Sequence, residues 1–330
     1  MQETLVRLKA RYWPDHLLGE ILSKRWTETA IPVIVLIVVA FALSGLIDNF
    51  FTPAALSDTA RQAGEVGFVV LGMALVVIVG GIDLSVGSMI SLLSTLTSGL
   101  IAGNAAMILP VAVGVVLLGM VIGGLNGLLV ITLRIHPLIV TLGMGAVLQG
   151  VVLLYSLGPA GKVPPGFTFV AYGKLFGIPI GAIVVLVLFA LVAGFLRYAR
   201  LGRYIYAVGD DDEGAKLMGL PRARVILFVY AFSGVCCALT ALYLVARFGV
   251  GQPYTGLNYT LASITPVVVG GTMLTGGKGG VLGTLLGVYL ISLLNNVLNF
   301  MDVSTHYQLI AQGLIVIAAV SIYVEKKKRI

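Results

Sequence analysis

One carboxylate in this sequence stands where a polar side chain could act on a solute. Asp83 follows paired glycines in the apolar stretch VGGIDLSVGS, residues 79–88. A Gly-Gly pair lets a helix stop and the chain turn, and a nearby carboxylate can accept hydrogen bonds from the amide groups that the break sets free. Asp83 therefore either supports the break, by capping the helix that begins near Ser85, or takes part directly in gating or solute contact.

The other residues with chemical potential do not form a catalytic or nucleotide-binding pattern. The loop TGGKGG, residues 275–280, resembles a phosphate-binding loop, but that motif requires Gly where Thr272 stands and Ser or Thr where Gly279 stands. The 3 histidines are scattered, so no catalytic triad or metal-ligand cluster can be assembled from them and the carboxylates. The sequence predicts a protein that is not an enzyme and carries no cofactor or metal of its own.

The composition predicts an all-α integral membrane protein. Hydrophobic residues make up 58% of the 330 residues and charged residues 11%, with a mean hydropathy of +1.05. Apolar runs long enough to cross the hydrocarbon core predict about ten transmembrane helices, some broken by glycine. These runs are 31–47, 64–81, 85–102, 106–133, 138–157, 178–196, 225–246, 259–275, 281–300 and 307–323. Two glycine stripes at four-residue steps predict closely packed helix faces: Gly119, Gly123, Gly127 and Gly279, Gly283, Gly287.

Lysine and arginine are unevenly distributed along the chain, whose formal net charge is +7. If both termini are cytoplasmic, most of the 21 basic residues fall on inner segments, as the positive-inside rule requires. We therefore expect a cytoplasmic N-terminal segment over 1–29, one transmembrane domain over 30–324, and a basic cytoplasmic tail over 325–330 that contacts membrane lipid. The same distribution argues against nucleic acid as a partner.

The glycine break is echoed later in the chain. Residues 79–87 align with 269–277, matching valine, both glycines, leucine, a hydroxyl residue and the last glycine. The echo predicts a two-fold internal repeat, with helix breaks that mark a transport pathway, although chance similarity in a glycine-rich chain is the alternative. The candidate pathway and gating residues are Gly80, Gly81, Asp83, Ser85, Asn126, Gln149, Gly270, Gly271, Asn295 and Asn296. Each polar side chain among them could equally tie two helices together.

Segments outside the predicted spans could dock partners. On the inner side, 200–224 carries charges of both signs and is predicted to be helical in its middle, with acidic residues at the helix start and Gly219 and Pro221 closing it. Such a helix suits docking, and an ordinary solvated loop is the alternative. On the outer side, 158–179 and 247–254 contain proline and aromatic residues.

Three motifs together resemble the permease subunits of ribose-type sugar ABC importers. They are GGIDLSVGS (80–88), LGRYIYAVGDDDEGAKLMGL (201–220) and TPVVVGGTMLTGGKGGVLGTLLG (265–287). The resemblance implies a multi-pass subunit of the bacterial inner membrane that pairs with a second permease, either a copy or a paralogue. It also implies ATPase subunits inside, which use ATP and Mg, and a periplasmic or extracellular solute-binding protein outside.

The resemblance implies roles for two sets of residues. The ATPase-coupling segment would comprise Asp212, Glu213, Gly214, Ala215, Lys216, Gly219 and Leu220. Gly214 departs from the usual alanine pair of the family, and the acidic run 210–213 is unusual. The docking surface for the binding protein would include Lys162, Tyr172, Arg247 and Tyr254. The implied function is ATP-driven uptake of a sugar or sugar-like solute by alternating access. The alternative is an ATP-independent channel or secondary carrier for a small neutral solute.

Overall fold

Long helices dominate the structure, a computed structural model that describes Val38, Ala42 and residues 52–323. Six helices in this part are long and apolar enough to cross a membrane. They are α4 (Pro53–Ile78), α6 (Ile108–Leu133, preceded by the 3-10 helix η1, Ala105–Met107), α7 (Pro137–Tyr155), α9 (Ile180–Tyr198), α12 (Arg222–Phe248) and α14 (Val281–Phe300). Three other helices have shorter described apolar parts: α5 (Val86–Ile101), α13 (Tyr259–Val269) and α15 (Thr305–Tyr323).

The predicted all-helical membrane fold is confirmed by these helices. The predicted span 31–47, apart from Val38 and Ala42, and the terminal segments 1–29 and 325–330 lie outside the described residues. The predicted run 259–275 is wrong in its second half, because the paired glycines after Val269 turn the chain there.

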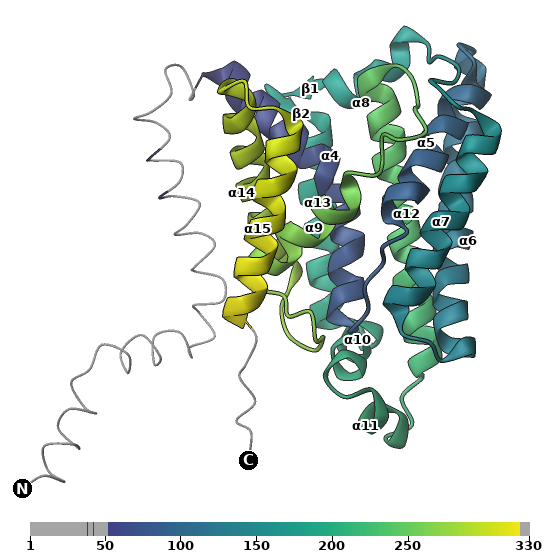
Figure 1. Cartoon of the computed structure of the whole chain (residues 1–330), viewed down its shortest axis with the longest axis vertical. Coiled ribbons are helices and arrows are strands. Elements are labelled where there is room, and N and C mark those ends of the chain that lie inside the picture. Colours follow the sequence, from purple (N-terminus) through teal and green to yellow (C-terminus); the bar gives the residue numbers. More distant parts are fainter. Residues whose placement is uncertain (1–37, 39–41, 43–51, 324–330) are drawn as a thin grey trace, which may run out of the picture.

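Short elements connect the long helices. Two of them, α10 (Arg200–Asp210) and α11 (Asp212–Leu217), make up most of the segment between α9 and α12. At the opposite end of the bundle lie η2 (Pro165–Thr168), α8 (Phe169–Tyr172) and the antiparallel strands β1 (Lys174–Leu175) and β2 (Ile178–Pro179). The bundle therefore has two distinct ends (Figure 1).

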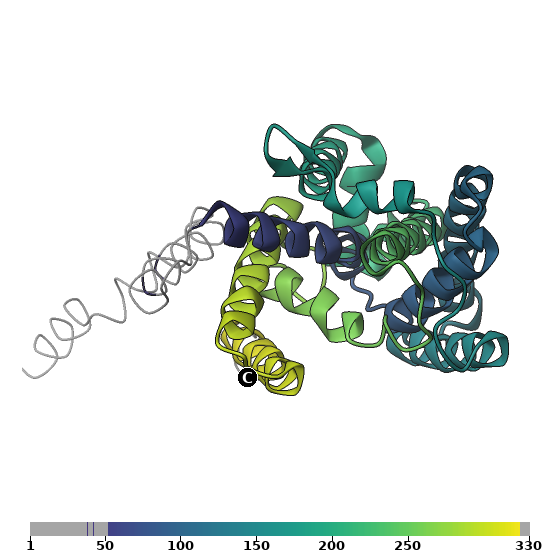
Figure 2. The same ribbon diagram turned by 90° about the horizontal axis from the view of Figure 1, so that it is seen from above.

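Helices α4 and α12 form the centre of the bundle. Helix α12 packs against α4, α5 and α6, and α4 packs against α9, α13 and α14. Seen from above, the blue and teal helices α5 to α7 lie to one side, and the green and yellow helices α13 to α15 lie to the other (Figure 2). The two glycine-broken helices, α4 and α13, are thus neighbours within one bundle.

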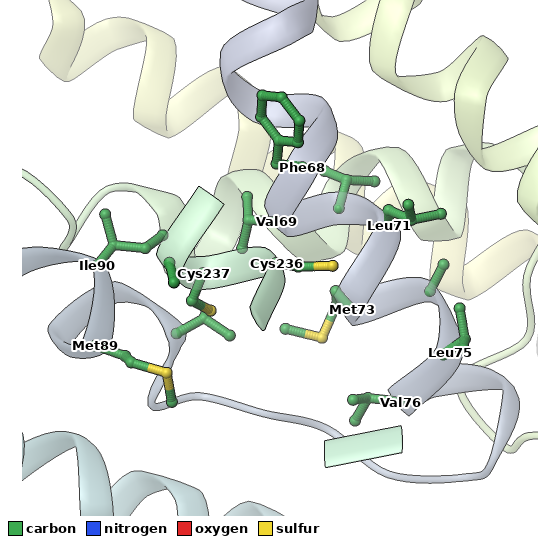
Figure 3. Close-up of a cluster of buried hydrophobic side chains, with 14 of the residues drawn as sticks. Phe68, Val69, Leu71, Met73, Leu75, Val76, Met89, Ile90, Cys236 and Cys237 are labelled. Carbon is green, nitrogen blue, oxygen red and sulfur yellow. The ribbon is translucent and has the colours of Figure 1, made fainter. Parts of the chain in front are cut away.

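A cluster of buried apolar side chains lies where α4, α5 and α12 meet. Figure 3 shows it, with Phe68 and Met73 of α4, Met89 of α5, and the adjacent thiols Cys236 and Cys237 of α12. Both cysteines are fully buried. They behave as small apolar residues of the core.

Glycines allow helices of this bundle to touch through their backbones, as the stripes predict. A side-chain carbon added to Gly123 would overlap the Tyr230 carbonyl oxygen of α12, and one added to Gly119 would lie 2.5 Å from the Gly234 oxygen. Gly283 and Gly287 meet α13 in the same way. Gly279 is an exception, since it lies in the loop before α14. The stripes are packing surfaces.

The substitution Gly123→Ala is expected to destabilise the bundle by about 2 kcal/mol, because overpacking a tight contact costs roughly 1–3 kcal/mol. The neighbouring Gly124 provides a matched control, since an added carbon there would meet no described atom within 4 Å. Gly124→Ala should be neutral or slightly stabilising, by about 0.5–1 kcal/mol. Thermal unfolding in detergent measures both variants, and equal melting temperatures would contradict the contact.

Candidate solute pathway and coupling segment

Helices α4 and α13 end in the same hydrogen-bonded turn. After α4, the Gly80 N–H donates to the Val77 oxygen (2.9 Å) and the Gly81 N–H to the Val76 oxygen (2.8 Å), with Gly80 at φ +83°. After α13, Gly271 takes the left-handed position at φ +86°. Its N–H donates to Val268 (2.9 Å), and the Thr272 N–H donates to Val267 (3.1 Å). Each helix therefore ends in a Schellman motif, which favours glycine at the left-handed position. In the structure Gly80 therefore corresponds to Gly271, whereas the sequence alignment pairs Gly80 with Gly270.

Asp83 is fully buried in the turn between α4 and α5. Its Oδ1 accepts hydrogen bonds from the Ser85 N–H (3.0 Å) and hydroxyl (2.6 Å), and its Oδ2 accepts one from the Ser233 hydroxyl of α12 (3.2 Å). The Asn126 amide of α6 donates to the Ser85 hydroxyl (2.8 Å). Asp83 and Asn126 thus tie the break to three helices, and this geometry favours the supporting role for Asp83 over direct contact with solute.

A fourth helix holds the same turn through Thr141, which sequence reasoning missed. The Thr141 hydroxyl oxygen of α7 accepts from the Leu84 N–H (3.0 Å) and lies 3.1 Å from the Ile82 carbonyl oxygen. The sequence places Thr141 near the start of an apolar helix, and that position does not indicate that its hydroxyl bonds to residues 57 and 59 positions away.

The two breaks meet each other and the α10 helix through backbone atoms. The Gly277 N–H donates to the Ile78 carbonyl oxygen at the end of α4 (2.9 Å). A side-chain carbon added to Gly276 would lie 2.8 Å from the Gly80 Cα, and one added to Gly209 of α10 would overlap the Ile78 oxygen. We call this contact of 78–80, 209 and 276–277 the glycine junction. It joins the segment between α9 and α12 to the first break and to the loop that follows the second break.

Tyr206 adds a side-chain link beside the glycine junction. Its hydroxyl on α10 donates to the Gly279 carbonyl oxygen (3.1 Å). Burial raises the pKa of the Tyr206 hydroxyl, so the group remains a donor at neutral pH. Helix α10 thus contacts the loop after the second break through close backbone packing at Gly209 and through the Tyr206 side chain.

Helix α11 has the form that the sequence predicts for a short capped helix. The Asp211 carboxylate caps it by accepting from the Gly214 N–H (3.0 Å), and Gly219, at φ +73°, ends it. An added carbon at Gly214 would lie 2.3 Å from the Asp211 carboxylate, so alanine there would require the capping side chain to shift. Arg222 forms an ion pair with Asp212 and so ties α11 to the start of α12.

The exposed residues of this segment are apolar as well as charged. Leu217 and Met218 are 87% and 71% exposed, whereas Ala215 is buried. A cavity of about 1300 Å³ separates α11 from the ends of α6 and α7, and it reaches Gly80, Gly81 and the Tyr230 side chain. An exposed apolar tip above a cavity is typical of a segment that contacts another protein.

The two outer stretches that the sequence singles out lie together at the other end of the bundle. The Ala160 N–H donates to the Gly251 oxygen (3.1 Å), and the Tyr172 hydroxyl donates to the Arg247 oxygen (3.2 Å). Lys162, Tyr172 and Tyr254 are exposed. The Arg247 guanidinium instead forms an ion pair with Glu65 of α4.

Comparison with known proteins identifies the chain. The family described as branched-chain amino acid transport system / permease component matches residues 55–320. The chain belongs to this permease family. It is therefore a multi-pass membrane protein and a transport component rather than an enzyme, as the sequence predicts.

Curated relatives of the permease confirm the resemblance to sugar importers. It is 34% identical to the ribose import permease protein RbsC of Haemophilus influenzae over 87% of this chain and 90% of that protein. It is also 34% identical to the D-allose transport system permease protein AlsC of Escherichia coli (90% and 91%). The fructose import permease protein FrcC of Rhizobium meliloti is 32% identical (90% and 85%). No solved structure gave a significant match.

The candidate pathway residues of the permease fall into separate groups. Gly80, Gly81, Asp83, Ser85 and Asn126 surround the first break, and Gly270 and Gly271 form the second. The Gln149 amide donates to the Pro253 oxygen (3.1 Å), and the Asn296 amide ties α14 to Ala55 (3.2 Å) and Thr59 (2.6 Å) of α4. Asn295 alone among these candidates lines a polar cavity between α4 and α13 to α15. Within the described part of the permease, no group of three His, Cys, Asp or Glu residues is placed to hold a metal.

Proposed function

We propose that this permease is the membrane subunit of an ATP-driven importer that carries a sugar or sugar-like small solute by alternating access. The observation that carries the proposal is the glycine junction, because it connects the segment between α9 and α12 to the end of α4 and to the loop that follows the second break. The ribose, allose and fructose permeases among the relatives support the solute class.

In this proposal α11 docks on a separate ATPase subunit, which binds ATP and Mg. Movement of the ATPase shifts α11 together with α10, which packs against it, and with the start of α12, to which the Asp212–Arg222 ion pair ties α11. The glycine junction passes that movement to the end of α4 and to the loop that follows α13. The pathway then opens alternately to the two sides of the membrane.

The proposal also covers the assembly and topology of the transporter. A second permease, either a copy or a paralogue, pairs with this chain, and a solute-binding protein docks near Lys162, Tyr172 and Tyr254. The chain crosses the bacterial inner membrane ten times with both termini in the cytoplasm. The similar ends of α4 and α13 support a two-fold internal repeat.

Purification of the chain from its native membrane in mild detergent tests the assembly. Mass spectrometry is expected to find an ATPase subunit in about equal amount, and proteoliposomes of the complex with its binding protein should take up solute only with ATP. Recovery of the chain alone, with solute movement that needs no ATP, would instead establish a channel or secondary carrier.

Reversing the charges on α11 tests the coupling segment. In the variant Glu213→Arg with Lys216→Glu, ATP-driven uptake is expected to fall at least about tenfold, because like-charge contacts replace matched ones at a docking surface. Both side chains are exposed, so the fold should be retained. Arg200→Glu, an exposed charge reversal at the start of α10, is the control. Uptake and ATP hydrolysis would be measured on the same proteoliposomes. ATP-driven uptake at the wild-type rate in the double variant would contradict the coupling role of α11.

A further inference from the structure

A second cavity, of about 330 Å³, lies at the end of the bundle opposite α10 and α11. It is lined by residues of α4, the end of α12, the segment before α13, and α13 to α15. Its size falls at the lower end of the range for small-ligand pockets, roughly 300–1,000 Å³. It lies beside the 247–254 stretch, where a binding protein would deliver solute.

The charges at this cavity cancel. Glu65 of α4 is nearly buried and forms an ion pair with Arg247 at the end of α12, and the Tyr259 hydroxyl donates to the same carboxylate. A site whose charges are already paired offers no net attraction to an ion. It suits a neutral solute.

Side-chain amides supply the rest of the polar lining. The Gln312 amide of α15 donates to the Asn295 oxygen of α14 (3.2 Å), and the Gln308 amide donates to the Asn299 oxygen (2.7 Å). Gln312 is only 6% exposed, yet its Oε1 has no hydrogen-bond partner among the described residues. A buried acceptor without a partner is unfavourable unless a ligand or water supplies a donor.

We propose that this cavity binds a neutral polyhydroxylated solute, with the Gln312 carbonyl oxygen as an acceptor for one of its hydroxyl groups. Amides both donate and accept, as sugar hydroxyls do, so the lining can satisfy a sugar in more than one orientation. The inference rests on the proposed uptake of a sugar and adds the place where the permease itself holds it.

Protection of an introduced thiol tests binding without requiring transport. Gln62 lines the cavity from α4, and Gln62→Cys would place a thiol there, while the two native cysteines are fully buried. A membrane-impermeant thiol reagent should label this thiol in the assembled complex. Four sugars that appear in the names of relatives would be tested as ligands: ribose, D-allose, fructose and L-arabinose. At least one of them should slow the labelling at least about threefold, because a ligand in the pocket excludes the reagent.

Asp58→Cys, on the same helix outside the cavity, is the control that no sugar should protect. Absence of labelling at position 62, or labelling that none of the four sugars slows, would overturn the inference. Protection at both positions would also overturn it, since the effect would then not be local.

Gln312→Leu tests the acceptor in transport. Uptake by the assembled complex is expected to fall about tenfold, because the solute loses a buried hydrogen bond. As a control, Thr265→Val removes a buried hydroxyl that donates to the Leu261 oxygen of its own helix, and it should leave uptake unchanged.

The two proposals fail differently in these experiments. Uptake of solute by the wild-type complex without ATP contradicts the proposed function, whereas sugar protection at position 62 would still support the site. Normal ATP-driven uptake in wild type and in Gln312→Leu alike would contradict the site and leave the proposed function intact.

Discussion

Gly209→Ala is expected to abolish ATP-driven uptake, with a loss of at least about 100-fold, because the added carbon cannot fit beside a main-chain oxygen without displacing one of the two segments. The carbon would overlap the Ile78 carbonyl oxygen, and the Gly277 N–H that bonds this oxygen lies 2.7 Å from the same position. Helix α10 must therefore move away from the glycine junction. ATP hydrolysis should persist, since α11 itself is unchanged.

The control for this variant is Gly194→Ala in α9, where an added carbon meets no described atom within 4 Å. Uptake and ATP hydrolysis would be measured on the same proteoliposomes, and melting temperatures in detergent would show that both variants are folded. Tight coupling in Gly209→Ala would mean that movement of α10 reaches the breaks by another route.

Asp83→Leu is expected to destabilise the permease by about 3 kcal/mol or more, because buried donors left without an acceptor cost roughly 1–3 kcal/mol each. The substitution removes the acceptor of the Ser85 N–H, the Ser85 hydroxyl and the Ser233 hydroxyl. Little folded protein should be recovered from the membrane. Ser233→Ala, which breaks one of these bonds and leaves no donor unpaired, should cost only about 1 kcal/mol.

The variant Asp83→Asn distinguishes a structural role of Asp83 at the helix break from a role in gating. The amide keeps one oxygen acceptor, so thermal unfolding in detergent should show a loss of only about 1 kcal/mol. Under the supporting role, uptake per folded molecule should be nearly unchanged. A tenfold loss of uptake at normal stability would assign Asp83 to gating instead.

Local patterns predicted much of this fold, because apolar runs, glycine pairs and helix caps are encoded over a few residues. The breaks after Val79 and Val269 and the cap at Asp211 are of this kind. The start of α4 was missed, since its polar first turns are buried by protein rather than lipid: the Thr59 hydroxyl meets Asn296 of α14. Hydropathy does not register such contacts.

The polar cavity was beyond the reach of sequence reasoning for a related reason. Glu65 pairs with Arg247 and Tyr259, which lie 182 and 194 residues away in the sequence, and no local motif predicts such pairs. Asn295 and Asn296 were equivalent candidates in the sequence. Helical geometry sends the first into the cavity and the second to the side of α4.

The central position of α4 has a consequence for how the protein is made. Its most apolar stretch has a mean hydropathy of 1.6, the lowest of the six long helices described, and 83% of that stretch is enclosed by protein, against 2.7 and 22% for α6. Synthesis proceeds from the N-terminus, so α4 emerges before α12 and α14, which enclose it. The nascent chain must therefore keep α4, the least apolar of the long helices described, in the membrane until those partners arrive. Stable insertion of α4 is completed only by the C-terminal half of the chain.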